Sequence, residues 1–551
     1  MKRKTILLLM TAALTLCGCV QSAQSTDSAA ETSGVTAEEL ADTGQENTQD
    51  GTDTDLQTPV SDIDTNDQFT DRDQDSSWDE ESAVTIFFSD DGVTVSGDGA
   101  EASGTAVTIM EAGTYVLSGT CSDGQIVIDC GDEDKVQLVL DGLTLTNDDG
   151  PCILVKSADK VFVTLADGTE NTLSDTGEAY AQEEDVEQNL DGVIFSLCTL
   201  TFNGSGTLRM NAGYDHAIVS KDDVKITDGT YEITAAGKGI AANDSIRISG
   251  GDLTITAEDD GLHTSNEDDD GKGYIYICGG SLTISSGDDG IHAATAMYVT
   301  DGVIDVTKSY EGLEGDSIDI TGGTIRVVSD DDGLNASTGS GQEMQGTMPQ
   351  GGPGGGPGGG KAPEQAESET VSVTPTRMGG GGGQTEDDGS YIRISGGDIC
   401  IDAEGDGIDS NGALYIDGGI IIVDGPGGAG NGALDVGSEA VITGGTVIAG
   451  GSSDMAVTFS DSSTQYSVLV YLDDTVSAGT EVTLRDADGN EILTYTPAKD
   501  ISSVVFSSSL LAEGTYTLRA GDETMTVEVS GISSTSGSSS SSFGGGPKSR
   551  G

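Results

Sequence analysis

The chain has 551 residues with 82 glycines and only 4% aromatic residues, and its 95 acidic residues far outnumber its 23 lysines and arginines. The formal net charge of −72 argues against nucleic acid and anionic membrane surfaces as partners, because both are negatively charged. The composition suits metal cations, or a polyanion held through them. A surface that is acidic only for solubility is the alternative.

The first 19 residues have the features of an export signal. The basic start MKRK precedes an apolar stretch that is too short to span a bilayer. The stretch ends in Leu16-Cys17-Gly18-Cys19, which resembles a bacterial lipobox with Cys19 as the lipidated residue. Cys17 is a second candidate, and an ordinary secretion signal cut nearby is the alternative. We therefore expect an extracytoplasmic protein at the bacterial cell surface, lipid-anchored to the cell membrane.

Three segments have compositions that cannot bury a core. Residues 20–82 are rich in Ser, Thr, Asp and Gln and predict a disordered tether. Residues 337–388 contain GGPGGGPGGG and predict a flexible insertion within the body, and residues 531–551 predict a disordered tail.

Residues 83–462 predict an all-β body that is a parallel β-helix of about 22 residues per turn. Strand-like segments alternate apolar and polar residues, and from about residue 200 they repeat, as in ITDGTYEITAAGKGIAA and ISGGDLTITAEDDGLHT. Successive repeats start 22, 29, 22, 21, 74 and 22 residues apart, with insertions in the two long intervals. Such a period with short strands and glycine turns is typical of a solenoid in which each turn covers the next. The repeats start at Ile226, Ile248, Ile277, Val299, Ile320, Ile394 and Ile416.

These starting positions and the positions two residues earlier are aliphatic throughout, so we expect them to point inward. The residue between them should then face solvent. Basic and tyrosyl side chains on such a strip could bind an acidic sugar through ring stacking and ion pairs, although these residue types are also common on exposed strands. The candidate ligand-binding residues are Lys225, Arg247, Tyr276, Tyr298, Arg393 and Tyr415.

An acidic column follows twelve residues after the repeat starts. Neighbouring turns lie about 4.8 Å apart, where two carboxylates repel by about 3 to 4 kcal/mol at an effective dielectric constant near 20. Calcium accepts carboxylate and carbonyl oxygens and would relieve this repulsion, while the preference of Asp for positions before Gly is the alternative explanation. Lys238 and Gly428 end the column, and His263 and His292 stand three residues beyond it. The candidate metal ligands are Asp215, Asp260, Asp289, Glu311, Asp332, Asp406 and Asp409.

Together these motifs resemble the carbohydrate-binding β-helix family typified by a clostridial surface protein that binds cellulose and acidic sugars. The match rests on GTYVLSGT, KVQLVLDGLTLTN, ADGTENTL, FNGSGTL and the repeated DDGI turns, and covers roughly residues 84 to 460. The resemblance implies a right-handed β-helix with a polysaccharide-lyase-like fold, calcium at the acidic turns and polysaccharide as ligand. Residues 463–530 lose the 22-residue register and predict a small antiparallel β-unit that caps the solenoid.

Two functions compete. The first is a non-catalytic, monomeric binding protein for acidic plant-type polysaccharide or cellulose, with calcium as the bound ion. The second is a calcium-dependent lyase acting on uronate polymers, which needs a base beside the cation. Lys238 and Lys308 lie near the column, but basic residues there are sparse, which favours the binding protein.

Overall fold

The computed structural model describes residues 67–182, 186, 188–338, 389–428 and 430–538. The predicted signal (1–19), the glycine-rich insertion from residue 339 and the tail from residue 539 lie outside these residues, as does the tether before residue 67. In the described part of the chain, no helix is long and apolar enough to cross a membrane.

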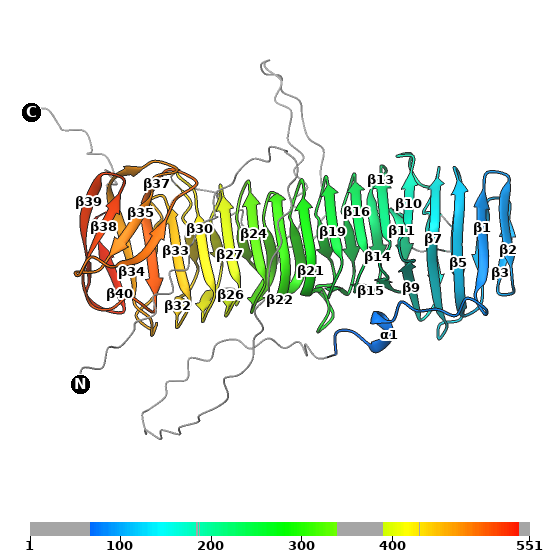
Figure 1. Cartoon of the computed structure of the whole chain (residues 1–551), viewed down its shortest axis with the longest axis horizontal. Coiled ribbons are helices and arrows are strands. Elements are labelled where there is room, and N and C mark those ends of the chain that lie inside the picture. The colour runs from blue at the N-terminus through cyan, green and yellow to red at the C-terminus, as the bar shows by residue number, and fades with distance from the viewer. Residues whose placement is uncertain (1–66, 183–185, 187, 339–388, 429, 539–551) are drawn as a thin grey trace, which may run out of the picture.

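The body is a parallel β-solenoid whose turns contribute strands to three stacks (Figure 1). Strands pair in parallel with those of the next turn, so Ile226 pairs with Ile248 and Ile248 with Ile277. The predicted register and parallel solenoid are thus confirmed, while the right-handed sense stays a prediction.

The first stack holds the strands that precede the acidic turns. Its members are β10 (Glu170–Asp175), β13 (Thr207–Ala212), β16 (Thr230–Ala235), β19 (Asp252–Ala257), β21 (Tyr274–Ser285), β22 (Ile291–Lys308), β24 (Thr324–Ser329), β27 (Asp398–Ala403), β30 (Ile420–Asp424) and β33 (Thr446–Gly451).

The second stack carries the predicted basic and tyrosyl strip. Besides parts of β21 and β22 it contains β9 (Lys160–Leu165), β12 (Thr199–Asn203), β15 (Asp223–Ile226), β18 (Ser245–Ile248), β23 (Leu313–Ile320), β26 (Tyr391–Ile394), β29 (Ala413–Ile416) and β32 (Ala440–Ile442).

The third stack follows the acidic turns and shares β22 and β23 with the others. Its remaining members are β4 (Ala106–Ile109), β6 (Gln125–Asp129), β8 (Ile153–Ser157), β11 (Gly192–Ser196), β14 (His216–Ser220), β17 (Ile240–Ala242), β20 (Leu262–Thr264), β25 (Leu334–Ala336), β28 (Ile408–Ser410) and β31 (Leu434–Val436).

Both ends of the solenoid depart from the repeat. At the start, the short helix α1 (Asp71–Gln74) precedes β1 (Val84–Ser89), which pairs antiparallel with β2 (Gly92–Ser96), as β3 (Ala100–Ser103) does with β4. The strands β5 (Gly113–Cys121) and β7 (Lys135–Asn147) already follow the parallel pattern, since β5 pairs with β7 and β7 pairs with β9 and β10. At the other end, β37 (Ile501–Ser508) pairs antiparallel with β33 and with β34 (Ser467–Val476), so it covers the last turn. An antiparallel sheet completes this unit, as predicted, from β35 (Val482–Arg485), β36 (Glu491–Tyr495), β38 (Gly514–Ala520) and β39 (Glu523–Val529). The strand β40 (Ser533–Ser536) pairs parallel with β34, so the prediction of disorder from residue 531 is wrong for this stretch.

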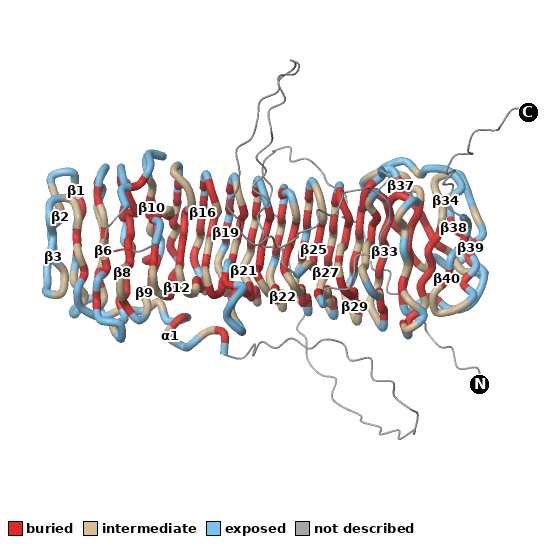
Figure 2. The backbone as a smooth tube through the Cα atoms, turned by 180° about the vertical axis from the view of Figure 1, so that it is seen from behind, coloured by how far each residue is buried: buried red, intermediate tan, exposed pale blue. Residues whose placement is uncertain are grey.

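The core is the column of aliphatic side chains predicted from the repeat. Ile246, Ile248, Ile275 and Ile277 are all 0% exposed, and Figure 2 shows the alternation of buried and more exposed residues around the turns. Burying such side chains contributes about 1.5 to 3 kcal/mol each, and this explains how a chain with few aromatic residues can fold. In stacked turns, each aliphatic side chain also packs on the equivalent one of the next turn.

Candidate functional site

The acidic column lies where the first stack turns into the third. Backbone hydrogen bonds define its register, because Gly261, Gly290 and Gly312 donate to the carbonyl oxygens of the acidic residues on the following turns. A glycine is required after each acid because the turns stack closely: a Cβ on Gly261 would lie 2.5 Å from the Gly290 oxygen. The column brings together Asp260, Asp289, Glu311, Asp332 and Asp406, as predicted.

The last turn of the column differs from the prediction. Ile408 pairs with Leu434, which is 26 rather than 22 residues later, because the glycine-rich loop between them holds extra residues. Gly407 accordingly donates to Gly432, so Gly432 rather than Gly428 follows Asp406. The same shift pairs Asp409 with Asp435. Asp435 is a candidate site residue that the fixed 22-residue period missed. Residues 432–435 (GALD) nevertheless resemble residues 407–409 (GID), because an apolar residue directly precedes the aspartate in both.

Asp215 stands beside the column rather than in it. Its carbonyl oxygen accepts from Gly237, which aligns it with the neighbouring positions Asp259 and Asp288. His216 occupies the position that pairs with Lys238, and its Nδ1 lies 3.2 Å from Asp215 Oδ1. Asp215 is therefore separated from the other predicted ligands by the turn that carries Lys238.

The first half of the column is neutralised by cations of the chain itself. Lys238 Nζ lies 2.5 Å from Asp260 Oδ2 and 3.3 Å from Asp259 Oδ2. His263 Nδ1 lies 2.8 Å from the same Asp260 oxygen. Burial raises the pKa of Asp260, but His263 and Lys238 outweigh it and hold that pKa well below its usual range. The lysine ammonium thus occupies the place that a cation would take among Asp259, Asp260 and Asp288.

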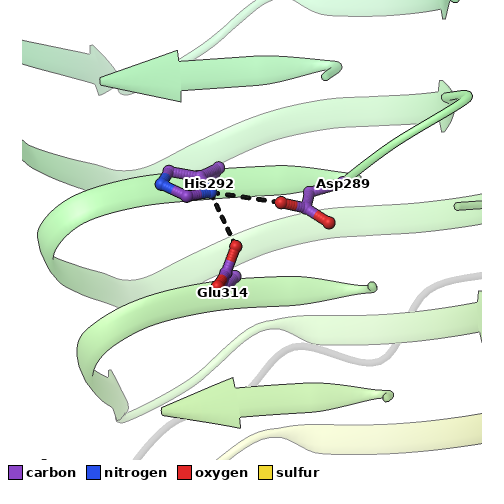
Figure 3. A group of neighbouring side chains, drawn as sticks. All are labelled: Asp289, His292 and Glu314. Atoms are coloured by element: carbon purple, nitrogen blue, oxygen red, sulfur yellow. Dashed lines mark hydrogen bonds and ion pairs between the residues drawn. The ribbon is translucent and has the colours of Figure 1, made fainter. Parts of the chain in front are cut away.

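The next two turns together hold a buried triad, with Asp289 and His292 on one turn and Glu314 on the following one (Figure 3). His292 Nδ1 lies 3.1 Å from Asp289 Oδ2 and 2.7 Å from Glu314 Oε2, and its ring stacks on His263 at 4.8 Å. Burial lowers the pKa of His292, but the two carboxylates raise it to about 10. Burial and Glu314 raise the pKa of Asp289 to about 8. The triad therefore carries its own positive charge.

The second half of the column has no such compensation. Asp332, Asp406 and Asp409 each offer an oxygen within 4.8 Å of the others, and no described residue forms an ion pair with them. The carboxylates of Asp332 and Asp406 accept backbone donors, the Asp406 nitrogen at 2.6 Å from Asp332 Oδ1 and the Gly432 nitrogen on Asp406 Oδ1. Glu311 accepts from Asn335 Nδ2 at 2.7 Å.

Burial and mutual repulsion raise the pKa of every acid in this second half. The pKa of Asp332 rises to about 7, that of Asp406 to about 6 and that of Asp409 to about 8, through burial first and then through neighbouring acids that include Asp435. Burial and Glu314 raise the pKa of Glu311 to about 9. Oxygen donors that repel one another in this way form a set that fits a hard divalent cation.

The predicted ligand-binding strip is one register column, but much of it is covered. Lys225, Arg247, Tyr276 and Tyr298 pair in succession along the second stack, and Arg393 pairs with Tyr415. The predicted solvent exposure is wrong for Lys225, Tyr276 and Tyr298, which are 5%, 5% and 8% exposed. Arg247, Arg393 and Tyr415 are half-buried.

The cover is the stretch from residue 67, which was expected to belong to the disordered tether. Here it includes α1 and packs against the strip, with Phe69 and Tyr276 ring centroids 6.5 Å apart. The prediction of disorder up to residue 82 is therefore wrong for this stretch. Its polar side chains find buried partners on the solenoid, a contact that composition does not reveal. At the far end of the strip, Tyr391, Tyr415, Ser438 and Glu439 line a cavity of about 480 Å³.

Part of the chain is similar to a described family of proteins. Residues 103–348 match a family model described as "Carbohydrate-binding domain-containing protein". A protein of that description from Acetivibrio thermocellus is 40% identical over 138 residues, which are 25% of this chain and 48% of the relative. The chain thus spans about half the length of this curated relative.

A solved structure is also similar in sequence. The polysaccharide lyase-like protein from C. thermocellum, determined as a gadolinium derivative, is 33% identical with a TM-score of 0.39, over 47% of this chain and 98% of that one. The matched residues 103–348 include the strip from Lys225 to Tyr298 and the column from Asp260 to Asp332. Asp406 and Asp409 lie beyond the matched residues. Residues 103–348 are therefore similar to a carbohydrate-binding domain family.

Proposed function

We propose that this protein is a non-catalytic, calcium-associated polysaccharide-binding protein of the bacterial cell surface, with a preference for acidic polymers. The similarity of residues 103–348 to a carbohydrate-binding domain family supports a polysaccharide as the partner. The observation that carries the metal and the acidic ligand is the uncompensated cluster of Asp332, Asp406 and Asp409.

Calcium suits this cluster better than a soft transition metal does. It takes six to eight oxygen ligands and tolerates irregular geometry, and the cluster offers carboxylates with no nitrogen or sulfur donor among its three residues. Asp332 and Asp409 are only half-buried, so part of the coordination shell faces outward. Water would complete that shell in the free protein, and a ligand carboxylate could replace the water.

The net charge favours a bridged grip over a direct one. A chain with a formal charge of −72 repels a polyuronate, and a divalent ion shared between the column and the polymer removes that repulsion locally. Flat crystalline cellulose is a weaker candidate, because most of the tyrosines on the strip are covered. We therefore favour chains of the polygalacturonate type.

A lyase reaction has less support. The base that sequence suggested beside the column is Lys238, whose pKa burial lowers but Asp260 and Asp259 raise above the usual lysine value. An ammonium held between two carboxylates does not abstract a proton at neutral pH. Lys308 is exposed and has no ion pair among the described residues.

The remaining parts of the proposal concern the context of the site. We propose that Cys19 carries the lipid anchor, that the protein acts as a monomer, and that the solenoid is right-handed. The last follows the strong preference for right-handed crossovers between parallel strands.

The test is retention on insoluble pectate and on cellulose, with calcium and with EDTA. The wild-type chain should bind pectate in calcium and elute in EDTA, while Asp406→Asn/Asp409→Asn should fail to bind. Asp398→Asn is the matched control, since it removes an exposed carboxylate from the same turn and should bind normally. Binding that ignores EDTA would refute the calcium bridge, and rising absorbance at 232 nm would show a lyase instead.

A further inference from the structure

The covered part of the strip is occupied by one continuous segment, residues 68–77, which we call the strap. At one end, Gln137 Nε2 donates to the Ser77 oxygen at 3.4 Å. At the other end, Tyr274 donates to Gln68 Oε1 at 2.8 Å and Arg247 donates to the Gln68 oxygen at 3.3 Å. The strap therefore runs along the second stack opposite to the direction in which the turns advance (Figure 1).

Asp73 is the centre of this contact and is 0% exposed. Its Oδ1 lies 2.8 Å from Lys160 Nζ and accepts from Thr201 Oγ1 at 3.1 Å. Its Oδ2 lies 3.5 Å from Lys225 Nζ. Its backbone oxygen accepts from Asn203 and Thr227, each at 3.1 Å. The solenoid thus places two ammonium groups and the Thr201 hydroxyl on the Asp73 carboxylate, and two further neutral donors on its backbone oxygen.

These donors belong to the rigid solenoid and not to the strap. Lys160, Thr201 and Lys225 come from β9, β12 and β15, three consecutive strands of the second stack. Thr70 holds Asp73 from the strap side, because its backbone nitrogen donates to Asp73 Oδ2 at 2.9 Å and its side chain accepts from the Asp73 nitrogen. Arg72 lies over the Phe162 ring at 4.4 Å.

Without the strap, Lys160 and Lys225 would lose the ion pair with Asp73 and keep only the more distant attraction of Asp223 on Lys225. Lys225 is buried, and burial together with Arg247 and Lys160 lowers its pKa. Lifting the strap would expose both ammonium groups to water and remove their ion-pair partner, so an acidic ligand could take the place of Asp73. A carboxylate on a hydroxylated ring matches the donors in charge and in hydrogen bonding.

We propose that Lys160, Thr201, Asn203 and Lys225 form a uronate subsite, and that Asp73 of the strap occupies it until an acidic polysaccharide displaces the strap. This inference rests on the proposed binding of acidic polysaccharide, but it places a direct carboxylate contact away from the calcium column. The exchange replaces one carboxylate by another, so the charge of the buried site is unchanged. The apparent affinity is then the intrinsic affinity multiplied by the fraction of molecules whose strap is lifted.

The chain contains its own reporter for this exchange. Trp78, the single tryptophan of the chain, follows the strap directly and is half-buried. Its fluorescence should change when the strap leaves the strip.

The experiment titrates trigalacturonate into the full chain in EDTA, so that the calcium column is silent. Asp73→Asn weakens the strap and should lower the dissociation constant at least about tenfold relative to wild type. Thr70→Ala, which loosens the strap without touching the lysines, should shift it in the same direction by less. Asp71→Asn is the matched control, since it removes an exposed carboxylate from the same helix and should behave as wild type.

Two further measurements test whether the gain in affinity depends on Lys225 and on the negative charge of the sugar. Asp73→Asn/Lys225→Gln should lose the gain, and a neutral trisaccharide should not bind any variant at this site. Because Asp73→Asn could also lower stability, thermal unfolding is followed in parallel, and trigalacturonate should raise its Tm more than that of wild type.

Equal affinity and equal Trp78 response in Asp73→Asn and wild type would overturn the inference and leave the strap as a structural clamp. Absence of binding by both in EDTA would also overturn it, while pectate binding in calcium could still stand. Loss of pectate binding in calcium as well would mean that the proposed function itself had failed.

Discussion

Lys238 Nζ lies 2.5 Å from Asp260 Oδ2, so the acidic column of this solenoid begins with an ammonium in the position of a metal ion. Lys238 and His292 neutralise the first acids of the column, and burial lowers the pKa of His263, which lies 2.8 Å from Asp260 as a neutral ring. Among the described residues, no cation forms an ion pair with Glu311, Asp332, Asp406 or Asp409. The column therefore contains an internally paired half and a half without cationic partners among the described residues.

Replacing Lys238 tests the paired half. Lys238→Met should lower the free energy of unfolding by about 3 kcal/mol, because Asp260 would remain buried without its partner. Lys308→Met, at an exposed lysine three turns further along, should change stability little. Chemical denaturation in EDTA measures both, and equal stability of the two variants would contradict the assigned role of Lys238.

The core register predicts a second result. Ile246→Ala removes a 0% exposed side chain that stacks between Val224 and Ile275, and should destabilise the protein by about 3 kcal/mol. Val303→Ala, at a 47% exposed position, should cost well under that amount. Thermal unfolding of both variants checks the prediction, which fails if the exposed position proves the more costly.

The buried carboxylate of Asp73 predicts a pH dependence of strap docking. Burial raises its pKa, but hydrogen bonds from Lys160 and Thr70 outweigh this and hold the pKa below the usual 3.8. A depressed pKa in the folded state gives stability that is fully present above pH 3.8 and is lost as the pH falls toward the folded-state value.

The measurement is the Tm difference between wild type and Asp73→Asn. It should be constant from neutral pH down to about 5 and shrink steadily below about 4. A difference that grows on acidification would show that Asp73 is not the ionised partner of Lys160.

The altered register of the last turn predicts which acid supports the open cluster. Asp435→Asn should weaken calcium binding several-fold, since Asp435 contributes to the raised pKa values of Asp332, Asp406 and Asp409. Asn431→Ala, at the position that a fixed 22-residue period would select, should leave calcium binding unchanged. If Asn431→Ala weakened calcium binding and Asp435→Asn did not, the fixed 22-residue register would be correct for this turn.

Much of the fold follows from sequence because one period repeats. Ile248, Ile277 and their equivalents are aliphatic and recur with a period near 22 residues once the two insertions are set aside, and this repeat predicts the stacked core and the acidic column. Asp435 was missed because the loop between β30 and β31 lengthens that turn, and loop length is not encoded in the period.

The strap and the pairing of charges could not be read from the sequence for a different reason. Asp73 is 87 residues from Lys160 and 152 from Lys225, and no pattern in a polar, glutamine-rich segment indicates such partners. Similarly, the contact of Lys238 with Asp260 on the adjacent turn depends on the direction of the lysine side chain, which the register does not determine.

The most direct test of the divided column is a calcium titration by calorimetry on three chains: wild type, Asp406→Asn/Asp409→Asn and Asp289→Asn/Glu314→Gln. Calcium at about a hundred times its dissociation constant should stabilise the wild type by about 2.7 kcal/mol, and EDTA should remove this gain. The Asp406/Asp409 variant should lose the site, with affinity at least about tenfold lower, while the Asp289/Glu314 variant should keep it. Retention of wild-type affinity by the Asp406/Asp409 variant, or its loss in the Asp289/Glu314 variant alone, would contradict the account.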